Sequence, residues 1–347
     1  MTRIYLDHNA TAPLRAEARN AMIAAMDVVG NPSSVHAEGR AAKSIVEKAR
    51  GQIAEAMGAM AADIVFTSGA TEAASLACAG RDLKGADIEH DAVAAWIDPA
   101  LPVSAEGVVQ VDDPAQTALQ SANSETGILQ ELPKGLAVSD MTQAFGKVPL
   151  AFDWSGVGMA LISAHKLGGP KGIGALVMPR GTDLTAQIKG GGQEMGRRSG
   201  TENVIAIAGF GAAAEAAQRD LEAGKWSQTE EFRNILEITL EDSAKATIFV
   251  GKGSDRLPNT SCFAVPGWKG ETQVMQMDLA GIAISAGSAC SSGKVRASRV
   301  LRAMRYDDAT ASSAIRVSLG VETTRQDVER FCEIWLRHYD KFRARAA

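Results

Sequence analysis

The stretch that decides the fold is Met159-Ala-Leu-Ile-Ser-Ala-His-Lys-Leu-Gly-Gly-Pro-Lys-Gly-Ile-Gly174, which joins two apolar runs through a polar, glycine-rich turn. The first run, 159–162, predicts a short buried strand that delivers Lys166 to its end, and the second, 173–178, predicts another strand. Burial disfavours the charged form of a lysine, so its amine becomes a nucleophile near neutral pH. The stretch therefore indicates a Schiff-base lysine. The alternative is an ordinary surface lysine in a loop.

Composition and charge narrow the class of protein. The chain has 347 residues, 46% of them hydrophobic and 22% charged, and a chain of this length usually divides into about two domains. The formal net charge of −5 argues against broad binding to nucleic acid or to membrane surfaces. No run approaches the roughly 18 apolar residues of a membrane span. The cysteines (Cys78, Cys262, Cys290 and Cys332) form no metal-ligand spacing, so no metal is expected, and a cytoplasmic location fits best.

A second strand-to-helix junction carries small polar residues. The β-branched run 64–66 leads into Thr67-Ser-Gly-Ala-Thr71 and then into an alanine-rich helix. The N-terminus of a helix offers backbone N–H groups and a positive dipole, which suit a phosphate. An ordinary N-cap by Ser68 or Thr71 would produce the same pattern.

Acidic and amide groups end other short runs. Asp140 closes the apolar run 136–139, where its carboxylate either pairs with a protonated ring nitrogen of a bound cofactor or caps the next turn. Val108–Val111 predicts a further strand, and Asn123 begins a polar loop. Polar groups at successive strand ends predict an open α/β sheet that binds its ligand at the carboxyl edge.

The second half of the chain adds three candidates. Residues 190–201 form a glycine-rich basic segment that is either a mobile loop or a second contact to an anion. Cys290 lies among small, polar neighbours, unlike a buried inert cysteine, and such a thiol suits nucleophilic chemistry. Arg316 lies inside a strand-like run, where it either binds a substrate carboxylate or forms a structural salt bridge. Composition changes after the helical stretch 204–221, which predicts a domain boundary near 223.

Together these residues resemble the NifS/IscS-type cysteine desulfurases, a branch of the fold-type I pyridoxal-phosphate (PLP) enzymes related to class V aminotransferases. The motifs occur in the family's order over nearly the whole chain. They are Tyr5-Leu-Asp-His-Asn-Ala-Thr, Gly30-Asn-Pro-Ser-Ser-Val-His, Phe66-Thr-Ser-Gly-Ala-Thr-Glu, Glu89-His90, Asp140-Met-Thr-Gln143, Ser163-Ala-His-Lys166, Arg198-Ser-Gly-Thr201, Ser288-Ala-Cys290 and Ile315-Arg-Val-Ser-Leu-Gly.

The resemblance implies an α/β fold: PLP-dependent transferase fold type I, whose large domain holds a mostly parallel seven-stranded sheet flanked by helices, with a smaller α+β domain. We expect the large PLP-binding domain at 13–223. The small domain, carrying the catalytic cysteine loop, would comprise 1–12 and 224–347.

The resemblance also implies roles for single residues. Lys166 would bind PLP as a Schiff base, His90 would stack on its ring and assist proton transfer, and Cys290 would accept sulfur. Arg316 would take the substrate carboxylate. The remaining cofactor contacts would be Ala70, Thr71, Ser163 and His165 at the phosphate, Thr201 reaching it from the second subunit of a homodimer, Asp140 at the ring nitrogen, Gln143 at the ring hydroxyl and Ser124 beside the ring oxygen.

The implied reaction converts L-cysteine to alanine, with a persulfide on Cys290 that passes to an iron–sulfur scaffold or thiolation protein. Three departures from the family pattern stand out: Ser124 replaces an asparagine, Ala164 replaces a glycine, and segments 91–120 and 127–137 are short. One alternative is another PLP-dependent lyase (acting on selenocysteine or cysteine sulfinate) or an aminotransferase, which does not need Cys290 as sulfur acceptor. Another is a non-catalytic paralogue that acts as a sulfur-relay partner.

Overall fold

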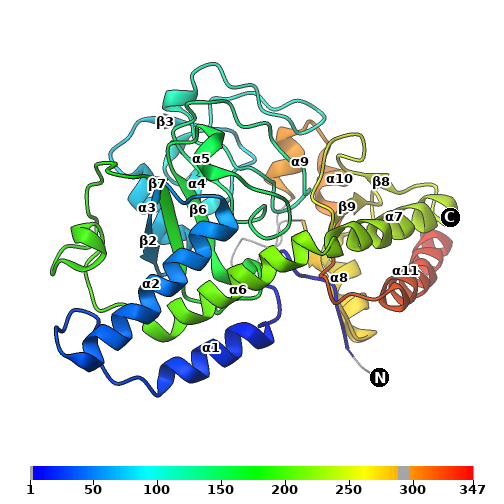
Figure 1. Cartoon of the computed structure of the whole chain (residues 1–347). Coiled ribbons are helices and arrows are strands. Elements are labelled where there is room, and N and C mark those ends of the chain that lie inside the picture. Colours follow the sequence, from blue (N-terminus) through cyan, green and yellow to red (C-terminus); the bar gives the residue numbers. More distant parts are fainter. Residues whose placement is uncertain (1–2, 288–296, 347) are drawn as a thin grey trace.

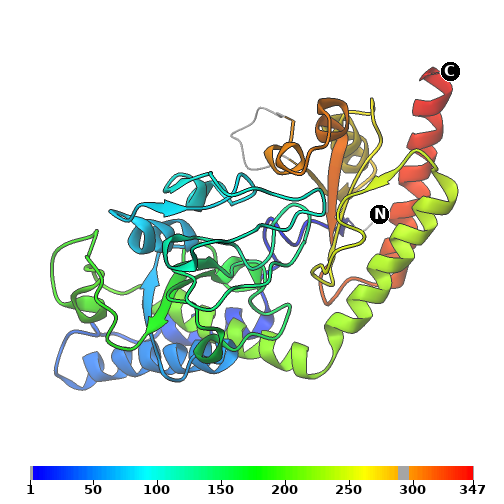
Figure 2. The same cartoon turned by 90° about the horizontal axis from the view of Figure 1, so that it is seen from above.

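The computed structural model describes residues 3–287 and 297–346. Figures 1 and 2 show a sheet with helices on both of its faces and, beside it, a smaller sheet covered by α7 and α11. The helices are α1 (Ala16–Met26), α2 (Ala37–Met57), α3 (Ala70–Cys78), α4 (Asp91–Ala94), α5 (Phe152–Ser155), α6 (Val204–Glu222), α7 (Lys225–Ser243), α8 (Gly270–Leu279), α9 (Arg299–Ala303), α10 (Asp308–Ser313) and α11 (Arg325–Ala346). Short 3₁₀ helices are η1 (Pro114–Gln116), η2 (Ala164–Lys166) and η3 (Gln193–Gly196).

The larger sheet has the strand order β2 (Ala62–Thr67), β7 (Gly174–Pro179), β6 (Ala160–Ser163) and β5 (Ser139–Asp140). Parallel bridges from Val138 to Ala118 and from Thr117 to Lys84 continue it to the parallel pair β3 (Leu83–Lys84) and β4 (Ile97–Asp98). Strand β7 runs in the direction opposite to that of β2, β6 and β5. The predicted α/β fold with a mostly parallel sheet is confirmed. Of the predicted seven strands, four form one continuous sheet, and single bridges link it to the pair β3–β4.

Side chains alternate between the two faces of this sheet, as strand geometry requires. On β6, Ala160 and Ile162 belong to the core under α1, α2 and α6, whereas Leu161 packs on the opposite face against α3. Strand β7 repeats the pattern with Val177 and Leu176. Both strands are buried on both faces, which explains the unbroken apolar runs in the sequence.

The smaller sheet is antiparallel, in the order β11 (Ser285–Ala286), β12 (Ala314–Ser318), β9 (Thr260–Ala264) and β8 (Ile248–Phe249). Its own core includes Leu6, Phe263 and Trp335. Strand β1 (Ile4–Tyr5) pairs with β10 (Ile282–Ala283), so the start of the chain joins this second unit.

We propose domains of 13–223 and of 1–12 plus 224–347, because the two cores divide near this boundary. Gly224, with φ 68°, separates α6 from α7 in a left-handed conformation that favours glycine. Residues of the second half, such as Cys262 and Val300, nevertheless pack in the core of the larger sheet. The two units thus share an extensive contact.

One predicted strand is wrong, and the short region between β4 and β5 holds little regular structure. Val109 of the predicted strand 108–111 makes only an isolated bridge to Val103. From 99 to 138, all of which the structure describes, the one regular element is η1. None of the helices in the described part of the chain combines the length and apolar character that crossing a membrane requires.

Candidate active site

A cavity of about 470 Å³ lies at the carboxyl ends of β2, β5 and β6. It brings together most of the residues that the sequence singled out. The predicted residues that line it are Ala70, Thr71, His90, Ser124, Asp140, Gln143, Ser163, His165 and Lys166. Thr201 and Arg316 are not among its lining residues, and Cys290 lies outside the described residues.

Lys166 is half-buried at the end of η2, so the surface-loop alternative does not hold for it. Its Nζ donates to the backbone oxygens of Asn9 and Ala10, at 2.8 Å each. Gly174, the first residue of β7, packs closely against β6 and the residue before α3: a Cβ there would lie 2.6 Å from the Ile162 oxygen and 2.7 Å from Gly69. The strand pair β6–β7 thus fixes the lysine at the cavity.

The end of the cavity near α3 is built from neutral and positive groups. Gly69 precedes α3 without a side-chain cap, so neither Ser68 nor Thr71 caps this helix, and the first turn retains backbone N–H groups with no partner inside the helix. His165 Nδ1 lies 3.0 Å from Thr11 Oγ1, and burial, together with Lys166, Lys171 and His90, lowers the pKa of His165 to about 4. Its imidazole is therefore neutral at physiological pH.

His90, which precedes α4, and Asp140, the last residue of β5, line the same cavity. The His90 Nδ1 accepts the N–H of Ala92 at 3.1 Å, so the neutral ring carries its proton on Nε2. The Asp140 Oδ1 accepts the N–H of Thr142 at 2.9 Å, so Asp140 caps the following turn as well as lining the cavity. Thr142 Oγ1 is buried without a partner among the described residues.

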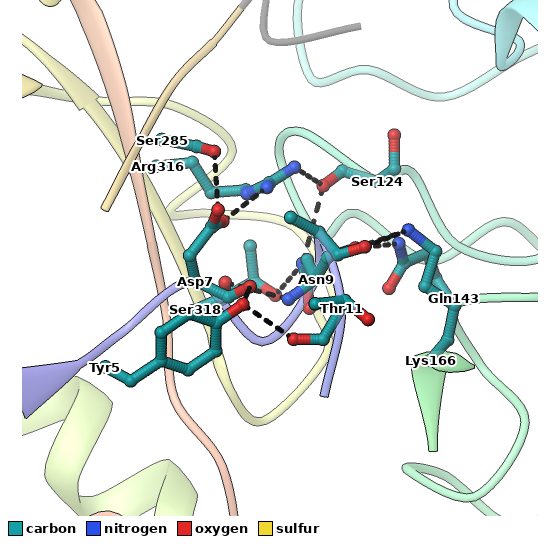
Figure 3. A network of polar contacts seen from close by, with 12 residues as sticks. Tyr5, Asp7, Asn9, Thr11, Ser124, Gln143, Lys166, Ser285, Arg316 and Ser318 are labelled. Atoms are coloured by element: carbon teal, nitrogen blue, oxygen red, sulfur yellow. Dashed lines mark hydrogen bonds and ion pairs between the residues drawn. The ribbon is translucent and has the colours of Figure 1, made fainter. Parts of the chain in front are cut away.

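Figure 3 shows the segment 5–11 running between the strand that carries Arg316 and the region that carries Gln143 and Lys166. Arg316 Nη2 pairs with Asp7 Oδ1 at 2.8 Å, and its Nη1 donates to the Ser124 oxygen at 2.8 Å. The Arg316 Nε is buried without a partner in the described part of the chain. Arg316 therefore forms the structural salt bridge, with Asp7, and it contacts the cavity only through Ser124, which lines it.

The basic segment 190–201 is tied down within the chain. Arg197 pairs with Asp63 at 2.8 Å, and Arg198 with Glu72 at 2.8 Å. Thr201 is exposed and lines a separate cavity of about 200 Å³, which shares Ser68 and Gly172 with the main cavity. Thr201 thus lies next to the cavity near α3 rather than inside it.

The described cysteines are poorly suited to nucleophilic chemistry. Burial raises the pKa of Cys78 and of Cys332 to about 12, and it holds the pKa of Cys262 well above its usual value. These thiols therefore remain protonated at neutral pH. In residues 3–287 and 297–346, no cluster of three or more His, Cys, Asp or Glu is placed to hold a metal ion.

The sequence assigned no role to several buried polar residues around the cavity, although Asn9 and Glu89 lie within the quoted motifs. Asn9 and Lys147 bond to Gln143, and Glu89 lies fully buried beside His90. Burial raises the pKa of Glu89 to about 8 and that of Glu125 to about 7. For Lys147, the available signal was its position four residues after Gln143, with a glycine between them.

The α/β fold, with a polar cavity at the carboxyl ends of its strands, defines the class of the protein. The family model described as "Aminotransferase class-V" matches residues 4–93 and 108–331, and the chain belongs to this family. The unmatched residues 94–107 fall within one of the short segments.

Within the family, the chain groups with the cysteine desulfurases. It is 37% identical to a cysteine desulfurase of Cereibacter sphaeroides, over 99% of this chain and 97% of that protein. It is 34% identical to the cysteine desulfurase IscS of Dictyoglomus turgidum, over 98% and 95% of the two chains. The crystal structure of a NifS-like protein from Rickettsia africae superimposes with a TM-score of 0.88 at 32% identity, over 97% and 99% of the two chains.

Proposed function

We propose that the protein is a PLP-dependent L-cysteine desulfurase that takes sulfur from cysteine onto Cys290 and releases alanine. The observation that carries the proposal is the meeting of Lys166, Asp140 and His90 in one cavity beside the first turn of α3. Lys166 ends η2, Asp140 ends β5 and His90 precedes α4. Each matches one part of PLP: aldehyde, ring nitrogen and ring face.

The residues that line the cavity offer a hydrogen-bond partner for each polar part of PLP. The first turn of α3, Thr71, Ser163 and neutral His165 would hold the phosphate, since they offer N–H and O–H donors. Asp140 would pair with the ring nitrogen and keep it protonated, and Gln143 with Ser124 would contact the ring oxygen. When bound, PLP withdraws electrons from the substrate Cα, which acidifies the Cα proton.

The chain's own residues would then handle protons and sulfur. Lys166, held by the Asn9 and Ala10 carbonyls, is placed to move the Cα proton once its amine is released. His90, whose ring proton is on Nε2, lines the same cavity and would assist. The Cys290 thiolate would attack the substrate sulfur. The substrate carbon–sulfur bond breaks as the new sulfur–sulfur bond forms, leaving a persulfide on Cys290 and, after protonation of the carbon, alanine.

The proposal extends to substrate orientation and partners. Arg316 would bind the cysteine carboxylate through its fork by exchanging Asp7 for it. We infer a homodimer in which the exposed Thr201 of each copy completes the phosphate end of the other. A cytoplasmic location and a sulfur-acceptor protein, either an iron–sulfur scaffold or a thiolation protein, complete the proposal, with no nucleic acid or membrane among the partners.

The test compares the PLP-loaded protein with its Cys290→Ala variant. We expect both to show the visible band of a PLP–lysine adduct, and only the unchanged protein to form a persulfide from cysteine. Cys332→Ala, which removes a buried thiol, should behave as the unchanged protein. Sulfide release at the normal rate by Cys290→Ala would instead favour another PLP-dependent lyase. A protein that stays colourless with added PLP would favour a non-catalytic paralogue.

A further inference from the structure

Lys147 is a lysine buried behind the cavity, with only 2% of its surface exposed. Its Nζ donates to Gln143 Oε1 at 2.7 Å and to Asn9 Oδ1 at 2.9 Å. Both acceptors are neutral amides, and among the described residues no carboxylate lies within salt-bridge distance of this amine. A buried lysine amine without a carboxylate partner is costly to keep in the fold, so its retention calls for a purpose beyond packing.

The local backbone aims Lys147 inward. Gly146 adopts φ 76°, and a Cβ there would lie 2.9 Å from Ala217 Cβ. The Gly146 carbonyl is fixed by the Trp226 indole N–H at 2.8 Å. The chain therefore turns sharply after Gln143 and returns the lysine to the amide four residues earlier.

The contacts of Gln143 determine which way its amide faces. Its Nε2 donates to the Asn9 backbone oxygen at 3.0 Å, while its Oε1 accepts from Lys147. A backbone oxygen can only accept, so the reversed amide would set two acceptors against each other. An amide nitrogen has two hydrogens, and Gln143 also lines the cavity. The second N–H is thus available on the cavity side.

We propose that Lys147 is a positioning residue that fixes the Gln143 amide with its N–H toward the cofactor ring oxygen. The inference rests on the proposed function, since it assumes that PLP occupies the cavity. Lys147 accomplishes this by occupying Gln143 Oε1, and it also polarises the amide so that Nε2–H is a stronger donor. Without Lys147, only the Asn9 backbone oxygen still orients the amide, so the N–H is held less firmly toward the ring oxygen.

Other charged groups surround Lys147 and bear on any pH measurement. Burial, with Lys166 and Arg316 nearby, holds the pKa of Lys147 well below its ordinary value. His8, which faces Lys147 from the N-terminal segment, has its pKa lowered to about 4 mainly by burial. A cavity of about 390 Å³ on the far side places further charged groups near Lys147: Arg15, Glu17, Asp220, Lys225 and Glu322.

The test is a double-mutant cycle on the PLP-loaded protein, with Lys147→Met, Gln143→Ala and the double variant. The readouts are the pH midpoint of the visible band and the dissociation constant for PLP, neither of which needs turnover. A donor stabilises the ionised ring oxygen, so its loss favours the protonated form. We expect Lys147→Met to raise the midpoint by about half to one pH unit, as the loss of one buried hydrogen bond implies. PLP affinity should fall several-fold.

In the Gln143→Ala background, Lys147→Met should produce no further shift of the midpoint. Gln273→Met, which removes a buried amide that bonds to Trp335 in the other core, should lower thermal stability without moving the midpoint. Lys147→Gln replaces Lys147→Met if the latter does not fold. If Lys147→Met left the pH midpoint of the visible band unchanged, or shifted it equally in the presence and absence of Gln143, the inference would be overturned while the proposed function stayed intact. Absence of the band in the unchanged protein would overturn both.

Discussion

Glu89 offers a test of the buried electrostatics beside the cavity. Its side chain is 1% exposed; Oε1 accepts the Gln120 N–H at 2.9 Å, and Oε2 is buried without a partner among the described residues. Burial, and to a lesser extent Asp140, raises the pKa of Glu89 from 4.5 to about 8. The folded protein therefore keeps the proton on the Glu89 carboxyl over a pH range in which the unfolded chain has lost it.

The sign of the pH dependence follows from this difference. Because the folded-state pKa is raised, the contribution of Glu89 is most favourable below pH 4.5 and is lost progressively as the pH rises toward about 8. At about 1.4 kcal/mol per pH unit, the full shift sets an upper bound of about 5 kcal/mol. Polarity and relaxation of the interior reduce such values, so we expect about 2 kcal/mol.

The perturbation is Glu89→Gln, which keeps an acceptor for Gln120 but does not titrate. Urea unfolding of the cofactor-free protein at pH 5, 7 and 9 measures the stability of the variant relative to the unchanged protein. We expect the variant to gain about 2 kcal/mol on the unchanged protein between pH 5 and pH 9. Glu271→Gln, at an exposed position, should show no such trend. A difference that stays constant or falls with pH would show that Glu89 does not keep its proton in the folded protein.

Two further substitutions probe the site. Arg316→Lys keeps the positive charge but loses the guanidinium fork that bonds to Asp7 and Ser124. The KM for cysteine should therefore rise about tenfold or more, with the visible PLP band unchanged. An unchanged KM would exclude Arg316 as the ligand of the substrate carboxylate. Gly174→Ala places a Cβ 2.6 Å from the Ile162 oxygen. It should lower the free energy of unfolding by about 3 kcal/mol, measured by thermal unfolding, and weaken PLP retention. Gly192→Ala, which has open space around the new Cβ, should change neither property.

The sequence predicted the sheet and the strand-end residues because both depend on local pattern. Apolar runs such as 159–162 are long enough to specify buried strands, and Lys166, Asp140 and Thr71 each lie at the end of a strand or within four residues of it. Parallel topology then brings these ends to one edge. The strand predicted at 108–111 failed because its apolar residues pack within an irregular region.

The buried polar network could not be predicted in the same way. Asn9 contacts Lys147, Gln143 and Thr260, which lie far from it along the chain, so no spacing rule identifies it. Lys147 and Glu89 resemble surface residues in sequence, because burial of a charged side chain is set by tertiary packing. Arg316 is an intermediate case, since its strand was predicted but its pairing with Asp7 was not.

The central claim is that sulfur from cysteine reaches Cys290 while alanine is released. The most direct measurement supplies the PLP-loaded protein with cysteine carrying a heavy sulfur isotope, in a single turnover, and quantifies both products by mass spectrometry. We expect one labelled sulfur on the peptide containing Cys290 for each alanine formed, in the unchanged protein and in Cys332→Ala alike. Label on another cysteine, or alanine formed at the normal rate by Cys290→Ala, would contradict it.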